Sequence, residues 1–276
     1  MITLFKLLSH CPLWLLHGLG AAMGWLVFLA SPTYRRRFVS NARQAGLTWR
    51  QWFGAVGESG KLVVELPRLW LGGPVRILWD GAEHVEAVLK KGRGLVFLTP
   101  HLGCFEIAPQ AYVQRYGHLG KPMTVLFRPP RQAWLREVVG VARQRPGLST
   151  APTTLSGVKQ MIKALKAGES VGLLPDQVPP EGMGLNAPFF GRDAYTMSLS
   201  VRLVQQTGAI VLLAWGERLS WGRGYRVHVQ PLTETLPATL LEAVTAVNHA
   251  MEMLVLQCPQ QYLWGYARYK QPRHSL

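Results

Sequence analysis

Apolar runs and amphipathic segments alternate along the chain from about residue 75, and this alternation predicts the fold. Short apolar runs with the composition of buried strands are separated by segments whose apolar residues recur at helical spacing. The strands are expected at 75–79, 95–98, 123–127, 171–174, 209–215 and 225–229, and the helices at 82–90, 107–116, 132–142, 156–167, 195–207 and 239–256. Residues 176–186 form a Gly/Pro-rich loop, and residues 40–72 are expected to be helical, with Pro67 bending or ending that run. We therefore predict an α/β fold with a mixed, largely parallel central sheet flanked by helices.

The first 37 residues have a different pattern. Residues 11–31 carry no formal charge and reach the length of about 20 mostly apolar residues that a membrane span needs. Gly18, Gly20 and Gly24 would allow close helix packing, and the basic run 35–37 suits the cytoplasmic side or anionic headgroups. These features predict a membrane-associated segment over 1–37 and a separate domain over 38–276. A spanning anchor and an interfacial helix fit equally well, a buried core helix is less favoured, and a secretory signal is disfavoured because the basic run follows the apolar one.

The net positive charge of the chain indicates that its binding partners are anionic. Lys plus Arg number 30 against 15 Asp plus Glu, which gives a formal net charge of +15. Such a field attracts phosphate groups, anionic lipid headgroups, an acidic protein or nucleic acid. The three cysteines are scattered and form no CxxC pair, so we expect neither a disulfide framework nor a zinc site, and a reducing compartment fits.

The stretch GLVFLTPHLGCFE, residues 94–106, carries the strongest candidate chemistry. His101 follows directly on an apolar strand, at the carboxyl end where open α/β sheets hold their ligands, and Glu106 follows five residues later in the first turns of a helix. An imidazole can take a proton from an attacking hydroxyl, while a carboxylate on its other nitrogen fixes the tautomer. The pair works only if the turn folds the loop residue His101 over the helix residue Glu106. A histidine merely packed at a strand end is the competing interpretation.

Other strand ends supply further polar groups. Arg128 follows the strand at 123–127, and Asp176 follows the strand at 171–174. Arg143 and Arg145 come just after the helix expected at 132–142. A single site that combines these side chains with His101 is plausible, although each alone is more typical of a loop cap. The chain has no GxSxG, HExxH or GxxxxGK[ST] motif, and Cys104 is more typical of a buried structural thiol than of a nucleophile.

A series of motifs in a fixed order gives the chain a resemblance to a known family. The motifs are LHGLG in the apolar segment, the RRR run, ELPRLW, HLGCFE, FRPP, KQMIKALKAGE, LLPDQ, APFFGRDAYT and finally CPQQYLW. Each is weak alone, but together they resemble the bacterial lipid A biosynthesis late acyltransferases, the lauroyl and myristoyl transferases. That family belongs to the lysophospholipid acyltransferase superfamily, and the resemblance runs over essentially the whole chain.

The resemblance implies an enzyme on the cytoplasmic face of the inner membrane, with 38–276 as its acyltransferase domain. It would move a fatty acyl chain from acyl carrier protein to a hydroxyl of a lipid A precursor, with no cofactor and no metal. By position, His101 would be the base and Glu106 its partner, while Arg143 or Arg145 and Asp176 would also take part. The segment after Asn41 and the residues after Asp176 depart from the usual family pattern, which leaves the acceptor open.

The basic surface suits three partners that the resemblance implies: acidic carrier protein, the phosphates of the acceptor lipid, and the anionic inner-membrane lipids. Two other classes of function remain. One is an acyltransferase for a glycerophospholipid, an ornithine lipid or a glycolipid. The other is a non-enzymatic basic protein that binds membrane or nucleic acid. Nucleic acid is the weaker partner, because no basic stripe is interleaved with aromatic residues.

Overall fold

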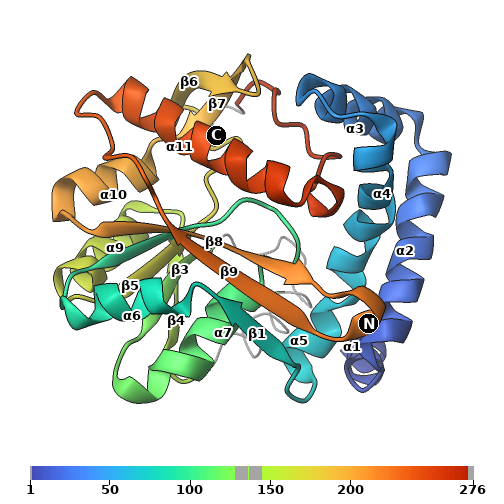
Figure 1. Cartoon of the computed structure of the whole chain (residues 1–276), viewed down its shortest axis with the longest axis horizontal. Helices are drawn as coiled ribbons and strands as arrows, with labels where there is room; N and C mark the ends of the chain where they lie inside the picture. The colour runs from blue at the N-terminus through green and yellow to red at the C-terminus, as the bar shows by residue number, and fades with distance from the viewer. Residues whose placement is uncertain (1, 128–135, 137–144, 273–276) are drawn as a thin grey trace.

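A seven-stranded sheet runs through the centre of the molecule (Figure 1). The computed structural model describes residues 2–127, 136 and 145–272. The strands are β1 Ile77–Asp80, β2 Leu95–Leu98, β3 Met123–Phe127, β4 Leu148–Pro152, β5 Ser170–Leu173, β8 Ile210–Arg218 and β9 Tyr225–Pro231, in the order β1-β9-β8-β2-β5-β3-β4. The neighbouring strands are parallel except for the antiparallel pair β8–β9. The predicted mixed, largely parallel sheet is confirmed.

The central strand β2 is buried on both faces, which explains its unbroken apolar run. Leu95 and Phe97 belong to the core beneath one face of the sheet, and Val96 and Leu98 to the core on the other. Helices α6 Ala82–Lys90 and α7 Ile107–Tyr116 pack against the first face. Helices α9 Leu155–Lys166, α10 Leu199–Thr207 and α11 Leu240–Gln257 pack against the second. Figure 1 shows α7 and α11 on opposite sides of the sheet.

Five helices precede the sheet and stack along one side of it (Figure 1). They are α1 Ile2–Ser9, α2 Leu13–Ala30, α3 Pro32–Gln44, α4 Trp49–Val64 and α5 Leu66–Leu71. The break between α4 and α5 falls at Glu65, and Pro67 occupies the first turn of α5. A proline there has no amide hydrogen to lose, so it ends the longer helical run, as predicted, while starting the next.

Helices α2 and α4 cross at a contact built from glycines. A Cβ atom added to Gly20 would lie 2.6 Å from the Cα of Lys61, and one added to Gly60 would lie 2.6 Å from the backbone nitrogen of Gly24. Both distances are far inside van der Waals contact, so only glycine fits. The close helix packing predicted for this segment is therefore confirmed for Gly20 and Gly24, whereas Gly18 faces open space.

A buried ionic group joins these helices to the sheet. Glu65 is fully buried and accepts hydrogen bonds from the Arg218 side chain (Nη2 to Oε1 2.7 Å) and from the Tyr225 hydroxyl (2.9 Å). The His17 ring of α2 lies 3.1 Å from Oε2 of the same carboxylate. Burial alone would raise the pKa of Glu65, but Arg218 and His17 outweigh it and lower that pKa to about 2. The carboxylate is thus ionised and ties α2, α5, β8 and β9 together.

Two sequence expectations fail in the second half of the chain. The expected loop over 176–186 and the start of the helix expected from 195 instead contain a hairpin, β6 Gly184–Phe189 and β7 Arg192–Met197, and α10 begins only at Leu199. Phe190 and Gly191 make its turn, both at positive φ, and packing against α11 stabilises the hairpin. Strand β4 was also not expected. The helix expected at 132–142 lies outside the described residues, apart from the single residue 136.

Candidate active site

The turn after β2 is held by two segments that are distant in sequence. Its Gly103 nitrogen donates to the carbonyl oxygen of Gln261 (2.9 Å), and the Cys104 nitrogen donates to that of Gly216 (2.7 Å). Gly103 has a φ of 58°. A Cβ atom there would lie 2.9 Å from the carbonyl carbon of Gly216, so the turn requires glycine. The end of β8 and the segment after α11 therefore fix the direction in which His101 points.

Asp176 makes two hydrogen bonds with His101. Its Oδ1 lies 2.7 Å from Nδ1 of the ring, and its Oδ2 accepts from the His101 backbone nitrogen at 2.8 Å. Asp176 is 1% exposed, and burial by itself would raise its pKa. The charge and the two hydrogen bonds of His101 outweigh burial, so the pKa of Asp176 lies below its usual range. An ionised carboxylate at Nδ1 places the ring proton there and leaves Nε2 as the basic nitrogen.

Tyr262 completes this arrangement. Its hydroxyl donates to Oδ2 of Asp176 at 3.2 Å, and its backbone forms an isolated bridge with Leu102. Burial and the Asp176 charge raise the pKa of Tyr262 well above its usual value, so the hydroxyl keeps its proton and acts as a donor. Tyr262 was not predicted from the sequence as a site residue. The only signal was its place in the CPQQYLW motif, because no local pattern links it to His101.

Glu106 lies at the N-terminal end of α7, five residues after His101, as expected. Its Oε2 accepts a hydrogen bond from the Trp70 indole nitrogen at 3.3 Å. From the sequence, Glu106 was expected on the second nitrogen of the imidazole, and Asp176 was expected in the same site as a substrate-binding residue beside Arg128, Arg143 and Arg145. In the structure, however, the carboxylate on Nδ1 is Asp176. Parallel strands β2 and β5 are neighbours, so their carboxyl ends bring His101 and Asp176 together.

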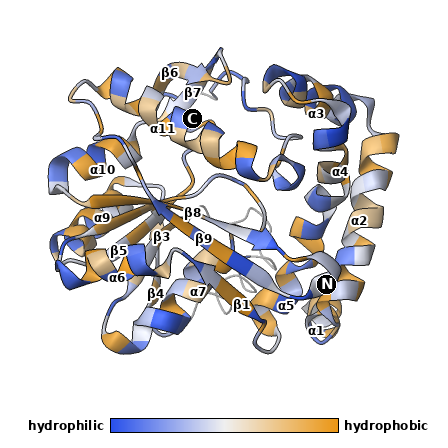
Figure 2. Ribbon diagram, in the orientation of Figure 1, coloured by the Kyte–Doolittle hydropathy of each residue, from blue (hydrophilic) through white to orange (hydrophobic). Residues whose placement is uncertain are grey.

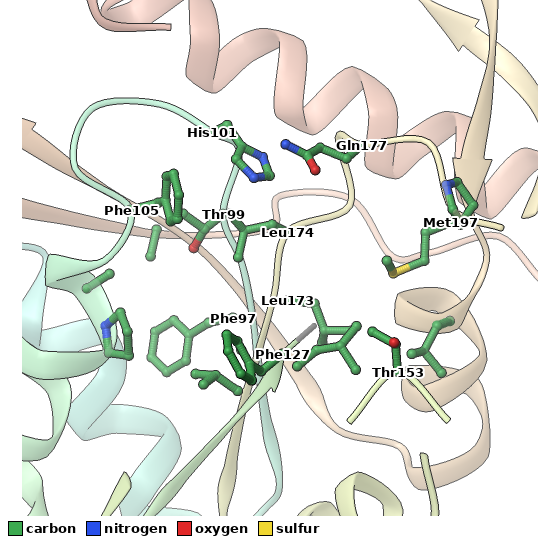
Figure 3. Close-up of a pocket in the computed structure, with 18 of the residues that line it drawn as sticks. Phe97, Thr99, His101, Phe105, Phe127, Thr153, Leu173, Leu174, Gln177 and Met197 are labelled. Carbon is green, nitrogen blue, oxygen red and sulfur yellow. The ribbon is translucent and has the colours of Figure 1, made fainter. Parts of the chain in front are cut away.

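An apolar cavity of about 680 Å³ extends from His101 around the carboxyl ends of the strands, with lining residues from both faces of the sheet (Figure 3). Thr99, His101, Glu106 and Gln177 supply polar groups to its wall. Much of the remaining lining is apolar, including Phe97, Phe105, Tyr112, Val125, Leu173 and Met197. Figure 3 shows His101 and Gln177 toward one end of the cavity lining and Phe97, Phe127 and Leu173 toward the other. Such a site suits a long apolar ligand whose polar end lies beside His101.

Comparison with known proteins identifies the family. The sequence profile of the bacterial lipid A biosynthesis acyltransferases matches residues 60–271, which is well over half of the chain. The chain belongs to this family. It is 26% identical over 216 residues to the lipid A biosynthesis palmitoleoyltransferase of Escherichia coli (strain K12), covering 76% of this chain and 68% of the relative. It is also 26% identical over 195 residues to the lauroyltransferase of that organism (69% and 60%) and 23% identical over 192 residues to its myristoyltransferase (68% and 57%).

Of the three arginines predicted to lie at the site, the structure describes one. Arg145 is described, and its Nη2 donates to the carbonyl oxygen of Leu69 in α5 at 2.7 Å. Burial lowers the pKa of this guanidinium. Arg128 and Arg143 lie outside the described residues. The structure therefore links Arg145 to α5, and the part of each arginine in substrate binding stays a prediction.

Two other kinds of chemistry, a metal site and a cysteine nucleophile, were considered for this part of the molecule. Within residues 2–127 and 145–272, no group of three or more His, Cys, Asp or Glu side chains could hold a metal ion. Cys104 lies close to His101 in sequence but is fully buried, and burial together with the Glu65 charge raises the pKa of its thiol well above the usual value. A protonated, enclosed thiol is a poor nucleophile. The imidazole is the group with a basic nitrogen at the cavity.

Proposed function

We propose that this protein transfers a fatty acyl chain from acyl carrier protein to a hydroxyl of a lipid A precursor, on the cytoplasmic face of the inner membrane. The observation that carries the proposal is a histidine held by a buried carboxylate at the end of a long apolar cavity. The family supplies the reaction class, and the names of its relatives supply the pathway. The acyl donor, the acceptor and the residue roles are our inference.

In the proposed mechanism, His101 acts as a general base through Nε2. It removes the proton of the acceptor hydroxyl while the oxygen attacks the thioester carbonyl of the donor. The tetrahedral intermediate then collapses, the carbon–sulfur bond breaks, and the imidazolium returns its proton to the leaving thiolate. The products are an ester and the free carrier thiol, and no covalent enzyme intermediate forms. Positioned proton transfer of this kind contributes about 10²–10⁴ in rate.

Charges around the imidazole favour this sequence. Asp176 stabilises the imidazolium, and Tyr262 and the His101 backbone keep the carboxylate in place. Glu106 lies on the cavity wall at the start of α7, and we assign it a second negative charge that steadies the imidazolium. The positive end of the α7 dipole favours the developing oxyanion on the same wall. Arg128, Arg143 and Arg145 are proposed to bind the phosphates of the acceptor.

The cavity is proposed to hold the acyl chain of the donor. Each buried methylene group contributes about 0.8 kcal/mol, so two carbons change binding by roughly tenfold while the chain still fits. The relatives are named for lauroyl, myristoyl and palmitoleoyl groups. A series of acyl carrier protein donors of different chain length measures the preference of this protein, and a donor rate independent of chain length would contradict the assignment of the cavity.

Three substitutions test the mechanism: His101→Gln removes the base, while Asp176→Asn and Glu106→Gln remove a carboxylate charge and keep the shape of the side chain. The control pair is His249→Gln and Asp193→Asn, which lie on the surface. With acyl carrier protein thioester and lipid A precursor, we expect His101→Gln to lose 10²-fold or more in kcat. Loss of the carboxylate charge beside a catalytic histidine costs about 10⁴ in serine proteases, which sets the upper range for Asp176→Asn. A His101→Gln enzyme with the parent rate would refute the mechanism.

The acceptor is tested separately from the chemistry. Mass spectrometry of lipid A from cells with and without the gene should show loss of one acyl chain, with its position and length. In vitro, a panel that includes glycerophospholipid, ornithine lipid and glycolipid should show transfer to the lipid A precursor only. Transfer to another member of the panel, still abolished in His101→Gln, would leave the catalytic assignment intact and replace the acceptor.

A further inference from the structure

Exposed apolar side chains gather on the N-terminal helices. Of the large apolar side chains that are exposed in the described part of the chain, twelve of nineteen lie between residues 4 and 63. On α2 the outward side includes Trp14, Leu19, Leu26 and Leu29, between 47% and 67% exposed. Leu4 and Leu7 of α1 and Trp49, Phe53 and Val63 of α4 are exposed as well. In Figure 2, α2 lies at the edge of the molecule away from the sheet. A contiguous apolar surface of this extent marks an interaction site.

The opposite side of α2 is covered by protein along its length. Leu13, Leu16, Gly20, Gly24 and Phe28 are buried at helical spacing, from the first residue of the helix to its last turn. α2 is the helix of the described residues that is long and apolar enough to cross a membrane, and a third of it is buried. A spanning orientation would carry the whole of α4 into the hydrocarbon with it.

Helix α4 is unsuited to that environment. It carries an exposed Arg50, and the Glu58 and Lys61 pair is 15% and 23% exposed. Charged side chains at the centre of a membrane helix are strongly disfavoured. An orientation parallel to the membrane plane avoids this problem, because the exposed apolar side chains then enter the lipid only to a shallow depth and the charged side chains of α4 are not carried to the bilayer centre.

A second apolar element lies outside the N-terminal segment. Trp221, at the tip between β8 and β9, is 89% exposed and adopts a φ of 59°. Positive φ is unfavourable for a bulky residue, so this backbone holds the indole outward at a cost. The neighbouring Gly222 contacts the start of α2 so closely that a Cβ atom there would lie 2.6 Å from the Cα of Trp14. Trp221 and Trp14 therefore lie at the same end of the apolar face, and tryptophan favours the membrane interface.

The charge around this face selects the kind of lipid. Residues 1–57 contain no Asp or Glu, and their basic residues are Lys6, Arg35, Arg36, Arg37, Arg43 and Arg50. Arg223, beside Trp221, is exposed as well. Basic residues attract anionic headgroups, and their attraction adds to apolar burial.

We infer that the protein lies flat on an anionic bilayer, with the outward side of α2 parallel to the membrane plane and Trp221 as a second insertion point. The inference rests on the membrane location proposed above, but not on the acyl transfer. This orientation places the cavity at a defined distance from the membrane surface. Phe5 of α1 contacts Trp70, and the Trp70 indole donates a hydrogen bond to Glu106 on the cavity wall. The acceptor lipid can thus reach the cavity from the leaflet on which the protein lies.

Spin labels measure the depth of each part of this face. The full chain carries Cys11→Ser and one cysteine in turn at Trp14, Leu19, Leu26 or Trp221, reconstituted in vesicles containing phosphatidylglycerol. A flat orientation places all four labels at similar, shallow depth, about 5–10 Å below the headgroup boundary. A label at Leu19 in the bilayer centre, with those at Trp14 and Leu26 at opposite interfaces, would overturn the inference in favour of a spanning helix.

The tip between β8 and β9 is tested by Trp221→Ser, with Leu241→Ser on α11 as the control, since Leu241 is 53% exposed. We expect roughly tenfold weaker binding to phosphatidylglycerol vesicles for Trp221→Ser and unchanged binding for the control. Both variants should keep full acyl transfer in detergent, so loss of binding with retained transfer separates this inference from the proposed reaction. Unchanged binding of Trp221→Ser to the vesicles would exclude the tip between β8 and β9 as an insertion point.

Discussion

Replacing Glu65 with Gln removes the charge at the centre of the buried ionic group while keeping the shape of the side chain. Arg218, 4% exposed, then keeps a full charge with Glu58 as its remaining carboxylate, 3.4 Å from Nη1. Breaking a buried ion pair on one side costs about 3–5 kcal/mol. Folded domains have only about 5–15 kcal/mol of stability, so this is a large share.

Glu86→Gln is the matched control, because it breaks an ion pair with Arg115 in which both side chains are more than 40% exposed. An exposed pair of this kind contributes about 0–1 kcal/mol. Urea unfolding in a fixed detergent, followed by tryptophan fluorescence, compares the two variants. Equal free energies of unfolding for Glu65→Gln and Glu86→Gln would refute the view that the ionic group holds the helices to the sheet.

The pH dependence of stability gives an independent estimate of how much the Glu65 charge contributes to the free energy of unfolding. The pKa of Glu65 is about 2 in the folded protein and about 4.5 in the unfolded chain. Because the folded value is the lower one, the stabilisation is complete above about pH 4.5 and is lost as the pH falls toward 2. The difference corresponds to about 3 kcal/mol. The parent protein should lose this amount over that range more than Glu65→Gln does, and parallel curves for the two proteins would contradict the assignment.

Three further predictions follow from local geometry. Gly60→Ala should destabilise the protein by about 2 kcal/mol or more in urea unfolding, because the added methyl group overpacks the crossing of α2 and α4. Gly54→Ala on the same helix should be neutral or stabilising, because a Cβ atom there would lie 3.4 Å from its nearest neighbour, the Cβ of Gln260. Tyr262→Phe should lower kcat about tenfold without changing KM, since a hydrogen bond to a charged group is lost, and an unchanged kcat would remove Tyr262 from the site. Thiol labelling of the native protein, read by peptide mass spectrometry, should modify Cys11 and spare Cys104; labelling of Cys104 without denaturant would contradict its burial.

The sheet was predictable because its evidence is local. An unbroken apolar run such as 95–98 indicates burial on both faces wherever it occurs in the chain, and the structure places it at the sheet centre. The hairpin β6–β7 was not predictable in the same way. β6 contains Pro188 and β7 begins with the charged pair Arg192 and Asp193, so both resemble loop sequence, and they become strands by pairing with each other and packing on α11.

The residues of the candidate site also differ in how far they could be predicted from local sequence. His101 was found because the residue and its strand are adjacent in sequence. Its hydrogen-bonded carboxylate was expected nearby, at Glu106, because spacing is the only distance that a sequence displays. The pairing with Asp176 depends on β2 and β5 lying side by side, and that of Asp176 with Tyr262 depends on the chain returning after α11. These distances are properties of topology, which residue spacing does not encode.

The return of the chain to the His101 turn has a consequence for biosynthesis. The helices inferred to bind lipid leave the ribosome before the sheet, whereas the segment around Tyr262, which fixes the turn and its aspartate, is made long after His101. Since domains form progressively during synthesis at about 5–20 residues per second, the nascent chain can reach the bilayer before the reaction centre is assembled. On the proposed mechanism and the inferred membrane orientation, delivery to the membrane would therefore precede activity, because the base would be held in place only after the segment around Tyr262 has been made.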